Sequence, residues 1–260
     1  MKVLFVGDVV GQSGRRVLLQ HLPTLRSREA LDVVVVNAEN AAAGFGITEK
    51  IAREFFDAGV DVLSTGNHVW DKKEALEFIL REPRLLRPQN YPAETPGSGW
   101  YVVRKAGATL GVLNVMGQVF MHPTLACPFA CVEHALVARP ADVQAILVDF
   151  HAEATSEKMA MAWFLDGRAS AVVGTHTHVP TADERILPGG TAYISDVGMT
   201  GCYDSVIGMD KDKALKRFVD KLPERHEVAE GVGTLCAVIL DIDGASGKAR
   251  DIRRIALREA

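Results

Sequence analysis

The chain has 260 residues, of which 48% are hydrophobic and 24% charged, the profile of an ordinary globular protein. This length suits one large α/β domain, and we expect a single domain over residues 1–260. The 29 basic and 33 acidic residues give a net charge of −4, so the chain lacks the broad positive field that holds polymeric nucleic acid by its phosphates.

The distribution of residues excludes two further classes. No apolar run approaches the ~18 residues that span a membrane, so no membrane partner is expected. The apolar stretch at the N-terminus breaks at Asp8, before any small-residue cleavage site, which argues against a signal peptide. The four cysteines are too few for a disulfide scaffold, and we expect reduced thiols in a cytoplasmic protein.

The first 80 residues alternate between short apolar runs and helical patterns. Continuous apolar residues predict buried parallel strands over residues 2–7, 32–37 and 61–65. Helical periodicity predicts helices over residues 15–22, 49–58 and 73–80, with Thr48 as a cap. This β-α-β-α-β order implies a right-handed parallel sheet.

The rest of the chain changes in character. Four prolines between residues 83 and 96 exclude a helix there, and strands over 100–105 and 110–116 form a predicted hairpin joined by residues 106–108. Buried strands follow over 146–150 and 170–174, with a helix over 156–165 between them, and antiparallel strands over 234–242 and 251–257 come last. Parallel pairing in the first half and antiparallel pairing in the second predict an α/β fold of two mixed sheets packed together, with helices outside.

Residues capable of metal or acid–base chemistry stand where the predicted buried strands end. Ligands of open α/β sheets bind outside the carboxyl ends of the strands, so we expect these residues to share one cleft. In chain order they are Asp8, Glu39, Asn40, Asn67, His68, His151, His176 and His178.

Taken singly, several of these residues have ordinary explanations. Asp8 could cap a turn, Asn67 could hold a left-handed turn, and a lone His151 could be a satisfied core or surface histidine. His176 and His178 are harder to explain in this way, because at i and i+2 in an extended backbone both rings would project to the same side. The presence of such residues at the ends of five predicted strands favours a functional site.

The donor set indicates which ligand such a site would take. Two carboxylates, two amides and the three imidazoles of His151, His176 and His178, without thiolates, suit Mn, Fe or Zn rather than Cu(I) or an iron–sulfur cluster. One bridging carboxylate with ligands on each side makes a two-metal site, with ions roughly 3.5–4 Å apart, and such sites run in-line displacement at phosphorus.

The motifs resemble a known superfamily. The order Gly7-Asp8, an acid after the second strand, Gly66-Asn67-His68, His151 and Gly174-Thr175-His176-Thr177-His178 resembles the calcineurin-like metallophosphoesterases. Val10 departs from the histidine of the first motif, and Glu39 replaces the aspartate of the second. Both departures, with stretches such as GDVVGQSGR, NAENAAAGFGIT and HAEATSEK along nearly the whole chain, are similar to the YmdB-like bacterial phosphodiesterases.

The resemblance implies a four-layer α/β/β/α sandwich and two metal ions, with iron or manganese favoured. It implies that Glu39 bridges the two metals and that Asn40 stands in for the histidine missing at position 10. It implies His68 as a general acid and not a ligand. The remaining ligands are divided between one metal (Asp8, Asn40, His178) and the other (Asn67, His151, His176).

The implied activity is that of a metal-dependent phosphoric diester hydrolase acting on a small-molecule substrate. A metal-bridging hydroxide would attack a 2′,3′-cyclic nucleotide in line, and His68 would protonate the ribose 2′-oxygen to leave a nucleoside 3′-phosphate. Two alternatives stay open: a phosphomonoesterase, for which Phe45 and residues 199–207 are candidate pocket walls, and a regulatory or scaffolding protein with residual hydrolysis. A homo-oligomer is compatible with the sequence. A dinucleotide-binding loop is not supported, because Val9 occupies a position where that loop needs glycine.

Overall fold

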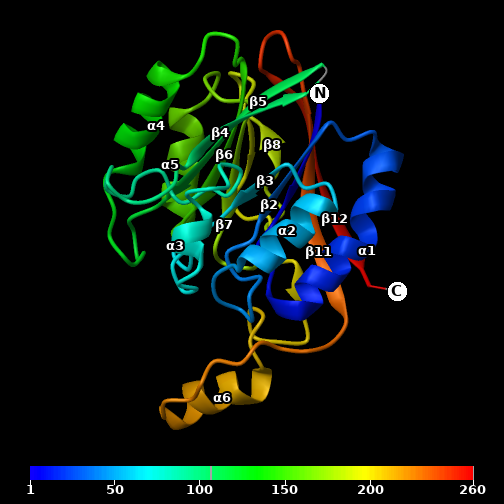
Figure 1. Cartoon of the computed structure of the whole chain (residues 1–260), viewed down its shortest axis with the longest axis vertical. Coiled ribbons are helices and arrows are strands. Elements are labelled where there is room, and N and C mark those ends of the chain that lie inside the picture. The colour runs from blue at the N-terminus through cyan, green and yellow to red at the C-terminus, as the bar shows by residue number, and fades with distance from the viewer. Residues whose placement is uncertain (106, 260) are drawn as a thin grey trace.

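The computed structural model describes residues 1–105 and 107–259 and contains two six-stranded sheets (Figure 1). The first sheet has the order β10-β11-β1-β2-β3, with β12 paired to β11. Its β1, β2 and β3 are parallel, whereas β11 runs antiparallel to β1, β10 and β12. The strands of this sheet are β1 (Lys2–Val6), β2 (Val33–Asn37), β3 (Val62–Ser64), β10 (Gly201–Cys202), β11 (Gly233–Ile242) and β12 (Ala249–Arg258).

The second sheet has the order β4-β5-β6-β7-β9-β8. Its strands are β4 (Trp100–Lys105), β5 (Ala108–Met116), β6 (Ala145–His151), β7 (Ala171–Thr175), β8 (Arg185–Ile186) and β9 (Ala192–Ile194). The pairs β4–β5 and β8–β9 are antiparallel, and the other three pairs are parallel. The predicted hairpin is confirmed, although Ala106 of its connection lies outside the described residues.

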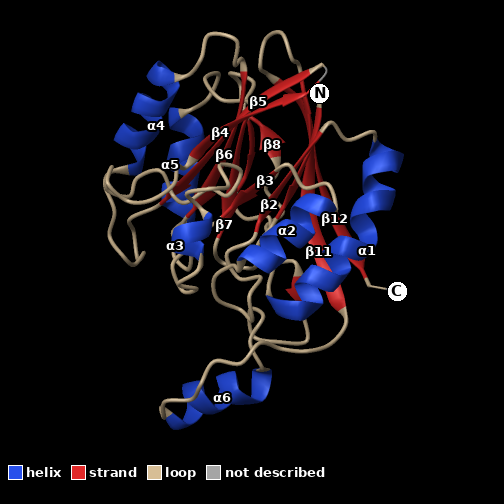
Figure 2. Cartoon of the chain, viewed as in Figure 1, coloured by secondary structure: helices blue, strands red, loops and turns tan. Residues whose placement is uncertain are grey.

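Helices cover the outer face of each sheet (Figure 2). Helices α1 (Gly11–Glu29) and α2 (Glu49–Asp57) pack on the first sheet, and α4 (Pro128–Ala138) and α5 (Thr155–Phe164) pack on the second. The predicted four-layer α/β/β/α order is therefore confirmed. The short α3 (Ala75–Phe78) lies beside these layers, and α6 (Lys211–Asp220), which has no buried residue, projects away from them.

The sequence of β2 shows why the layers stack in this way. All five residues of this strand are buried, because both faces of the sheet are covered. Val33 and Val35 point into the core between the two sheets, and Val34 and Val36 point into the core under α1 and α2. The inter-sheet core joins residues of both sheets, including Phe5 of β1 and Val112 of β5.

Several boundaries and one pairing differ from the prediction. Helix α1 is much longer than residues 15–22, and α3 keeps only four residues of the predicted helix over 73–80. The second half of the chain is not simply antiparallel: β5, β6 and β7 are parallel, because α4 and α5 provide the crossovers between them. Among the described residues, no helix combines the length and apolar character needed to cross a bilayer.

Candidate metal centre

The predicted site residues lie together at the edge where the parallel strands of both sheets end. Asp8 follows β1, Glu39 and Asn40 follow β2, and Asn67 follows β3. His151 is the last residue of β6, and His176 and His178 follow β7. The structure thus brings residues from five strands of two sheets to one place.

Two overlapping groups of ligand-type atoms form at this edge, and Glu39 belongs to both. One group consists of Glu39, His151 and His176, and the other of Asp8, Glu39 and His178. Within each group the ligand-type atoms all lie within 4.8 Å of one another. A shared carboxylate between two groups is the arrangement that a two-metal site needs.

His151 stands at the middle of the first group. Its Nε2 lies 3.2 Å from Glu39 Oε1 and 3.1 Å from His176 Nδ1. Asn67 joins this group, because its Oδ1 lies 3.0 Å from the same nitrogen. A carboxylate oxygen, an amide oxygen and two imidazole nitrogens therefore converge on one small volume.

Asn40 joins the second group with its amide nitrogen. Asn40 Nδ2 donates to Glu39 Oε1 at 3.1 Å and lies 3.1 Å from His178 Nε2. A metal would take the amide oxygen, so ligation by Asn40 requires the amide to turn over, which exchanges two atoms of nearly equal size.

Each of the three histidines turns one ring nitrogen outward onto an acceptor of the chain. His178 Nδ1 lies 2.8 Å from the carbonyl oxygen of Ile207, and His176 Nε2 lies 3.2 Å from Glu153 Oε2. His151 Nδ1 lies 2.9 Å from the hydroxyl of Thr175. With only the outer nitrogens protonated, the inner lone pairs of all three rings would face the two groups, as metal-binding histidines require.

A buried acid that the sequence analysis did not identify sets the tautomer of His151. The Thr175 hydroxyl donates to Asp149 Oδ1 at 2.7 Å, so its oxygen accepts from His151 Nδ1. Ser64 also donates to Asp149. Burial raises the pKa of Asp149 to about 7. Asp149 lies within β6. A single acid in a predicted buried strand is the only feature of the sequence that could have pointed to its role.

The buried carboxylates of the centre favour the binding of positive charge. Burial raises the pKa of the Asp8 carboxyl, and Asp8 Oδ1 has no hydrogen-bond partner among the residues that the structure describes. Burial would also raise the pKa of Glu39, but the His151 imidazole holds it at about 2. Burial alone would lower the pKa of His151, but the Glu39 carboxylate raises it to about 9. Burial and the neighbouring His151 lower the pKa of His176 to about 3. Two buried carboxylates and one unpartnered oxygen thus fit a site for cations.

The backbone around His176 and His178 differs from the expected extended form. Both residues have positive φ, 100° at His176 and 66° at His178, and both lie beyond the end of β7. The two rings therefore reach the centre from a bent loop, and not from the same side of a strand. Such conformations are uncommon outside glycine and concentrate at functional sites.

Gly66 is required by the close approach of its backbone to the centre. A Cβ at this position would lie 2.2 Å from His151 Nε2 and 2.3 Å from Glu39 Oε2. Any side chain at residue 66 would therefore displace donors of both sheets.

His68 lies at the rim of the centre and faces a cavity. Its Nδ1 lies 2.8 Å from Asp71 Oδ2, and its ring packs edge-on against Phe45 with 5.0 Å between the ring centroids. The cavity has a volume of about 420 Å³. It is lined by Glu39, Asn40, Gly44, Phe45, His68, Glu153, His176, Thr177, His178, Ile207, Met209 and His226.

The lining includes residues that the sequence analysis did not assign to the site. His226, which has no role in the sequence analysis, is exposed and borders the cavity, with its ring centroid 6.1 Å from that of Phe45. It reaches this place because the segment after α6 returns beside residues 206–210, where Asp210 donates its backbone N–H to Glu227. This pairing has no local sequence signal.

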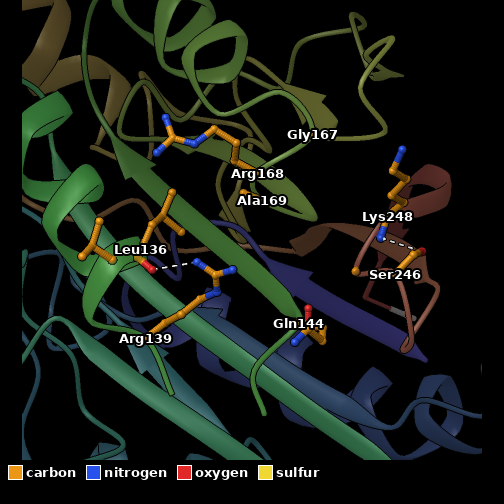
Figure 3. Close-up of a pocket in the computed structure, with 10 residues that line it drawn as sticks. Leu136, Arg139, Gln144, Gly167, Arg168, Ala169, Ser246 and Lys248 are labelled. Carbon is orange, nitrogen blue, oxygen red and sulfur yellow. Dashed lines mark hydrogen bonds between the residues drawn. The ribbon is translucent and has the colours of Figure 1, made fainter. Parts of the chain in front are cut away.

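A second hollow lies at the opposite ends of β6 and β7 and carries three cations, Arg139, Arg168 and Lys248 (Figure 3). Arg139 donates to the carbonyl of Leu136 at the end of α4, and Arg168 pairs with Glu133. The two arginines are thus engaged with a helix end and with an acid, which explains them structurally.

The chain is similar to known proteins along nearly its whole length. A family model described as YmdB-like protein matches residues 4–255. A 2′,3′-cyclic-nucleotide 2′-phosphodiesterase from Bacillus subtilis strain 168 is 49% identical over 259 residues, which cover 100% of this chain and 98% of the relative.

Two crystal structures share the fold over nearly their whole length. One is a hypothetical protein from Thermus thermophilus, with a TM-score of 0.94 and 45% identity over 100% of both chains. The other is a phosphatase from Mycoplasma pneumoniae, with a TM-score of 0.94 and 35% identity over 99% of this chain and 93% of that one. These matches confirm the resemblance predicted from the motifs: the chain belongs to the YmdB-like family and has the two-sheet fold of the calcineurin-like metallophosphoesterases.

Proposed function

We propose that the chain is a two-metal phosphodiesterase that hydrolyses 2′,3′-cyclic nucleotides to nucleoside 3′-phosphates. The observation that carries this proposal is the pair of donor groups that share Glu39 beside a cavity faced by His68. The name of the Bacillus subtilis relative supports the substrate class. A volume of about 420 Å³ also lies in the range of small-molecule sites.

The ligand assignment follows the two donor groups. Glu39 would bridge the two metals, and the other residues that would hold them are Asp8, Asn40 and His178 on one side and Asn67, His151 and His176 on the other. Iron or manganese suits this set of oxygen and imidazole donors. When bound, the two cations supply charge that neutralises the phosphoryl oxygens and lowers the pKa of a nearby water.

His68 supplies the proton that the leaving group needs. Asp71 accepts from Nδ1 and fixes the ring, so Nε2 is the nitrogen available to the cavity. As a water oxygen bonds to phosphorus and the P–O2′ bond breaks, proton transfer from Nε2 to the departing ribose 2′-oxygen leaves a free 2′-hydroxyl and a 3′-phosphate. Phe45 packs against the same ring and limits its rotation.

Part of the cavity lining is apolar. It consists of Phe45, Ile207 and Met209, and Ile207 is 52% exposed. An exposed apolar wall next to a charged centre suits a substrate that has a phosphate at one end and a nucleoside at the other.

We further propose that residues 1–260 act as one domain in the cytoplasm, which the shared inter-sheet core and the low cysteine content support.

A substrate panel with Mn²⁺ or Fe²⁺ tests the proposal. We expect turnover of 2′,3′-cyclic AMP to adenosine 3′-phosphate, identified by chromatography against the 2′-phosphate, and little release of phosphate from nucleoside monophosphates. The Mycoplasma pneumoniae relative is called a phosphatase, so the second candidate is a phosphomonoesterase. Faster hydrolysis of monoesters than of cyclic diesters would select that candidate. Absence of hydrolysis with both classes would reject both and leave the regulatory alternative.

A further inference from the structure

We propose that Asp196, paired with the buried Lys158, is a positioning residue that holds the loop of residues 176–178, the two-histidine loop, in its metal-binding shape. This inference rests on the metal centre of the proposed function and concerns residues that the centre itself does not contain. Lys158 lies on α5, and Asp196 follows β9. Their side chains are each 2% exposed, and Lys158 Nζ donates to Asp196 Oδ2 at 2.7 Å.

Asp196 binds the residue between the two histidines. The backbone N–H of Thr177 donates to Asp196 Oδ2 at 3.1 Å, and the Thr177 hydroxyl donates to the same oxygen at 2.8 Å. The second carboxylate oxygen, Oδ1, accepts from the backbone of Gly198 at 2.8 Å. Both oxygens of Asp196 are therefore satisfied, and Thr177 supplies two of the four hydrogen bonds.

The two-histidine loop needs this support because its backbone is unfavourable on its own. His176 and His178, which flank Thr177, both have positive φ. L-residues adopt this region rarely, and such residues persist only where the surroundings fix them. Thr177 lies between the two histidines, so its hydrogen bonds to Asp196 hold the backbone on both sides in place.

The burial of the ion pair supports a role in geometry rather than in stability. Two charges that are buried lose their hydration, and their mutual attraction only about offsets this loss. An apolar pair of similar volume would therefore give the same free energy of unfolding. Lys158 holds the negative charge of Asp196 in place, and a charged acceptor binds N–H and O–H donors more strongly than a neutral one. Residues behind metal ligands typically contribute about 10–100-fold to metal affinity.

Metal retention tests the inference without reference to catalysis. Protein loaded with Mn²⁺ is dialysed against a graded series of chelator, and bound metal is measured by mass spectrometry. We expect Thr177→Val, which removes the hydroxyl donor, to lose metal at roughly tenfold lower chelator concentration, and Thr177→Ser, which keeps it, to behave as wild type. The double variant Lys158→Met/Asp196→Asn leaves no unpaired buried charge and should lose metal at least as readily.

Controls separate positioning from stability. Asp142→Asn breaks the exposed pair with Arg104 and should leave metal retention unchanged. Melting temperatures of the metal-free proteins are measured in parallel, and retention is compared well below the lowest of them. The inference is overturned if Thr177→Val keeps metal within twofold of Thr177→Ser, a comparison that stands even if the double variant fails to fold. Wild-type protein that takes up no metal would reject the proposed function itself and this inference with it.

Discussion

The Glu39 carboxylate and the His151 imidazole lie 3.2 Å apart, Oε1 to Nε2, although one residue follows a strand of the first sheet and the other ends a strand of the second. Both side chains are almost completely buried. The contact joins the two sheets at their common carboxyl edge, and the donor groups of the centre are arranged around it.

Glu39→Ala should empty both halves of the centre. The carboxylate belongs to both donor groups, so its loss removes a ligand from each. We expect metal content to fall from two ions per chain to less than one, and turnover to fall by more than ~100-fold. Metal analysis after gel filtration checks this. A variant that still holds two ions would exclude Glu39 as the bridging ligand.

His68→Ala should lower turnover without loss of metal. The ring contacts Asp71 and Phe45 and belongs to neither donor group. General acid catalysis contributes about 10²–10⁴-fold, so kcat for a cyclic nucleotide should fall within that range. The loss should be much smaller for bis(p-nitrophenyl) phosphate, because its leaving group departs without a proton. An equal loss on both substrates, or a drop in metal content, would contradict the role as an acid.

Gly66→Ala should disrupt the centre although it adds only a methyl group. The new Cβ would lie 2.2 Å from His151 Nε2 and 2.3 Å from Glu39 Oε2, and overpacking of this kind costs about 1–3 kcal/mol. Gly244→Ala is the matched control, since a Cβ there would meet nothing within 4 Å. We expect loss of metal and activity from the first variant and none from the second. Equal metal content in the two variants would show that residue 66 has room.

Asp149→Asn should make the metal-free protein more stable at pH 8 and less able to bind metal. Burial raises the pKa of Asp149 from 3.8 to about 7, so the folded state holds a proton that the unfolded state has lost. Asp149 therefore lowers the free energy of unfolding progressively as pH rises from about 4 through 7. Its replacement should raise the free energy of unfolding by up to about 4 kcal/mol above that range and leave it unchanged below.

Two measurements check this prediction. Chemical denaturation in the presence of chelator at pH 4 and pH 8 should show a gain only at the higher pH. Metal retention should fall, because an amide nitrogen placed against Thr175 would donate to its hydroxyl and disturb the hydrogen bond to His151 Nδ1. A variant with wild-type stability at pH 8 would mean that Asp149 is ionised in the folded protein at little cost.

The layers of the fold could be predicted because their signals are local. The buried run of β2 and the alternation of strands with helices are visible in the sequence, and the positions of Asp8, Asn67 and His151 at strand ends indicated a shared edge. Helix α6 was missed. None of its residues is buried, and its contacts with the segment that follows are ion pairs such as Lys213–Glu227 and Lys216–Glu224, which leave no apolar signal in the sequence. The two-residue strands β8 and β10 are too short to show one.

The support of the candidate site was much harder to predict than its donors. Asp149 and Asp196 hold donors through contacts between residues far apart in the chain, and only the folded structure shows which partners they find. The approach of His226 to Phe45 likewise depends on the return of the chain after α6. The bent shape of the two-histidine loop was mistaken for an extended one, because non-glycine residues give no warning of positive φ.

The division of the donors between the two sheets has a mechanical consequence. Residues 8, 39, 40 and 67 follow strands of one sheet, and residues 151, 176 and 178 end or follow strands of the other. Cations bound among them would cross-link the two sheets at this edge. The opposite edge is held by the apolar core between the sheets and by polar contacts such as the ion pair of Lys105 with Asp61. In loaded protein, slow hydrogen exchange should therefore be concentrated near the carboxyl ends of β1, β2, β6 and β7, and chelation should abolish that gradient.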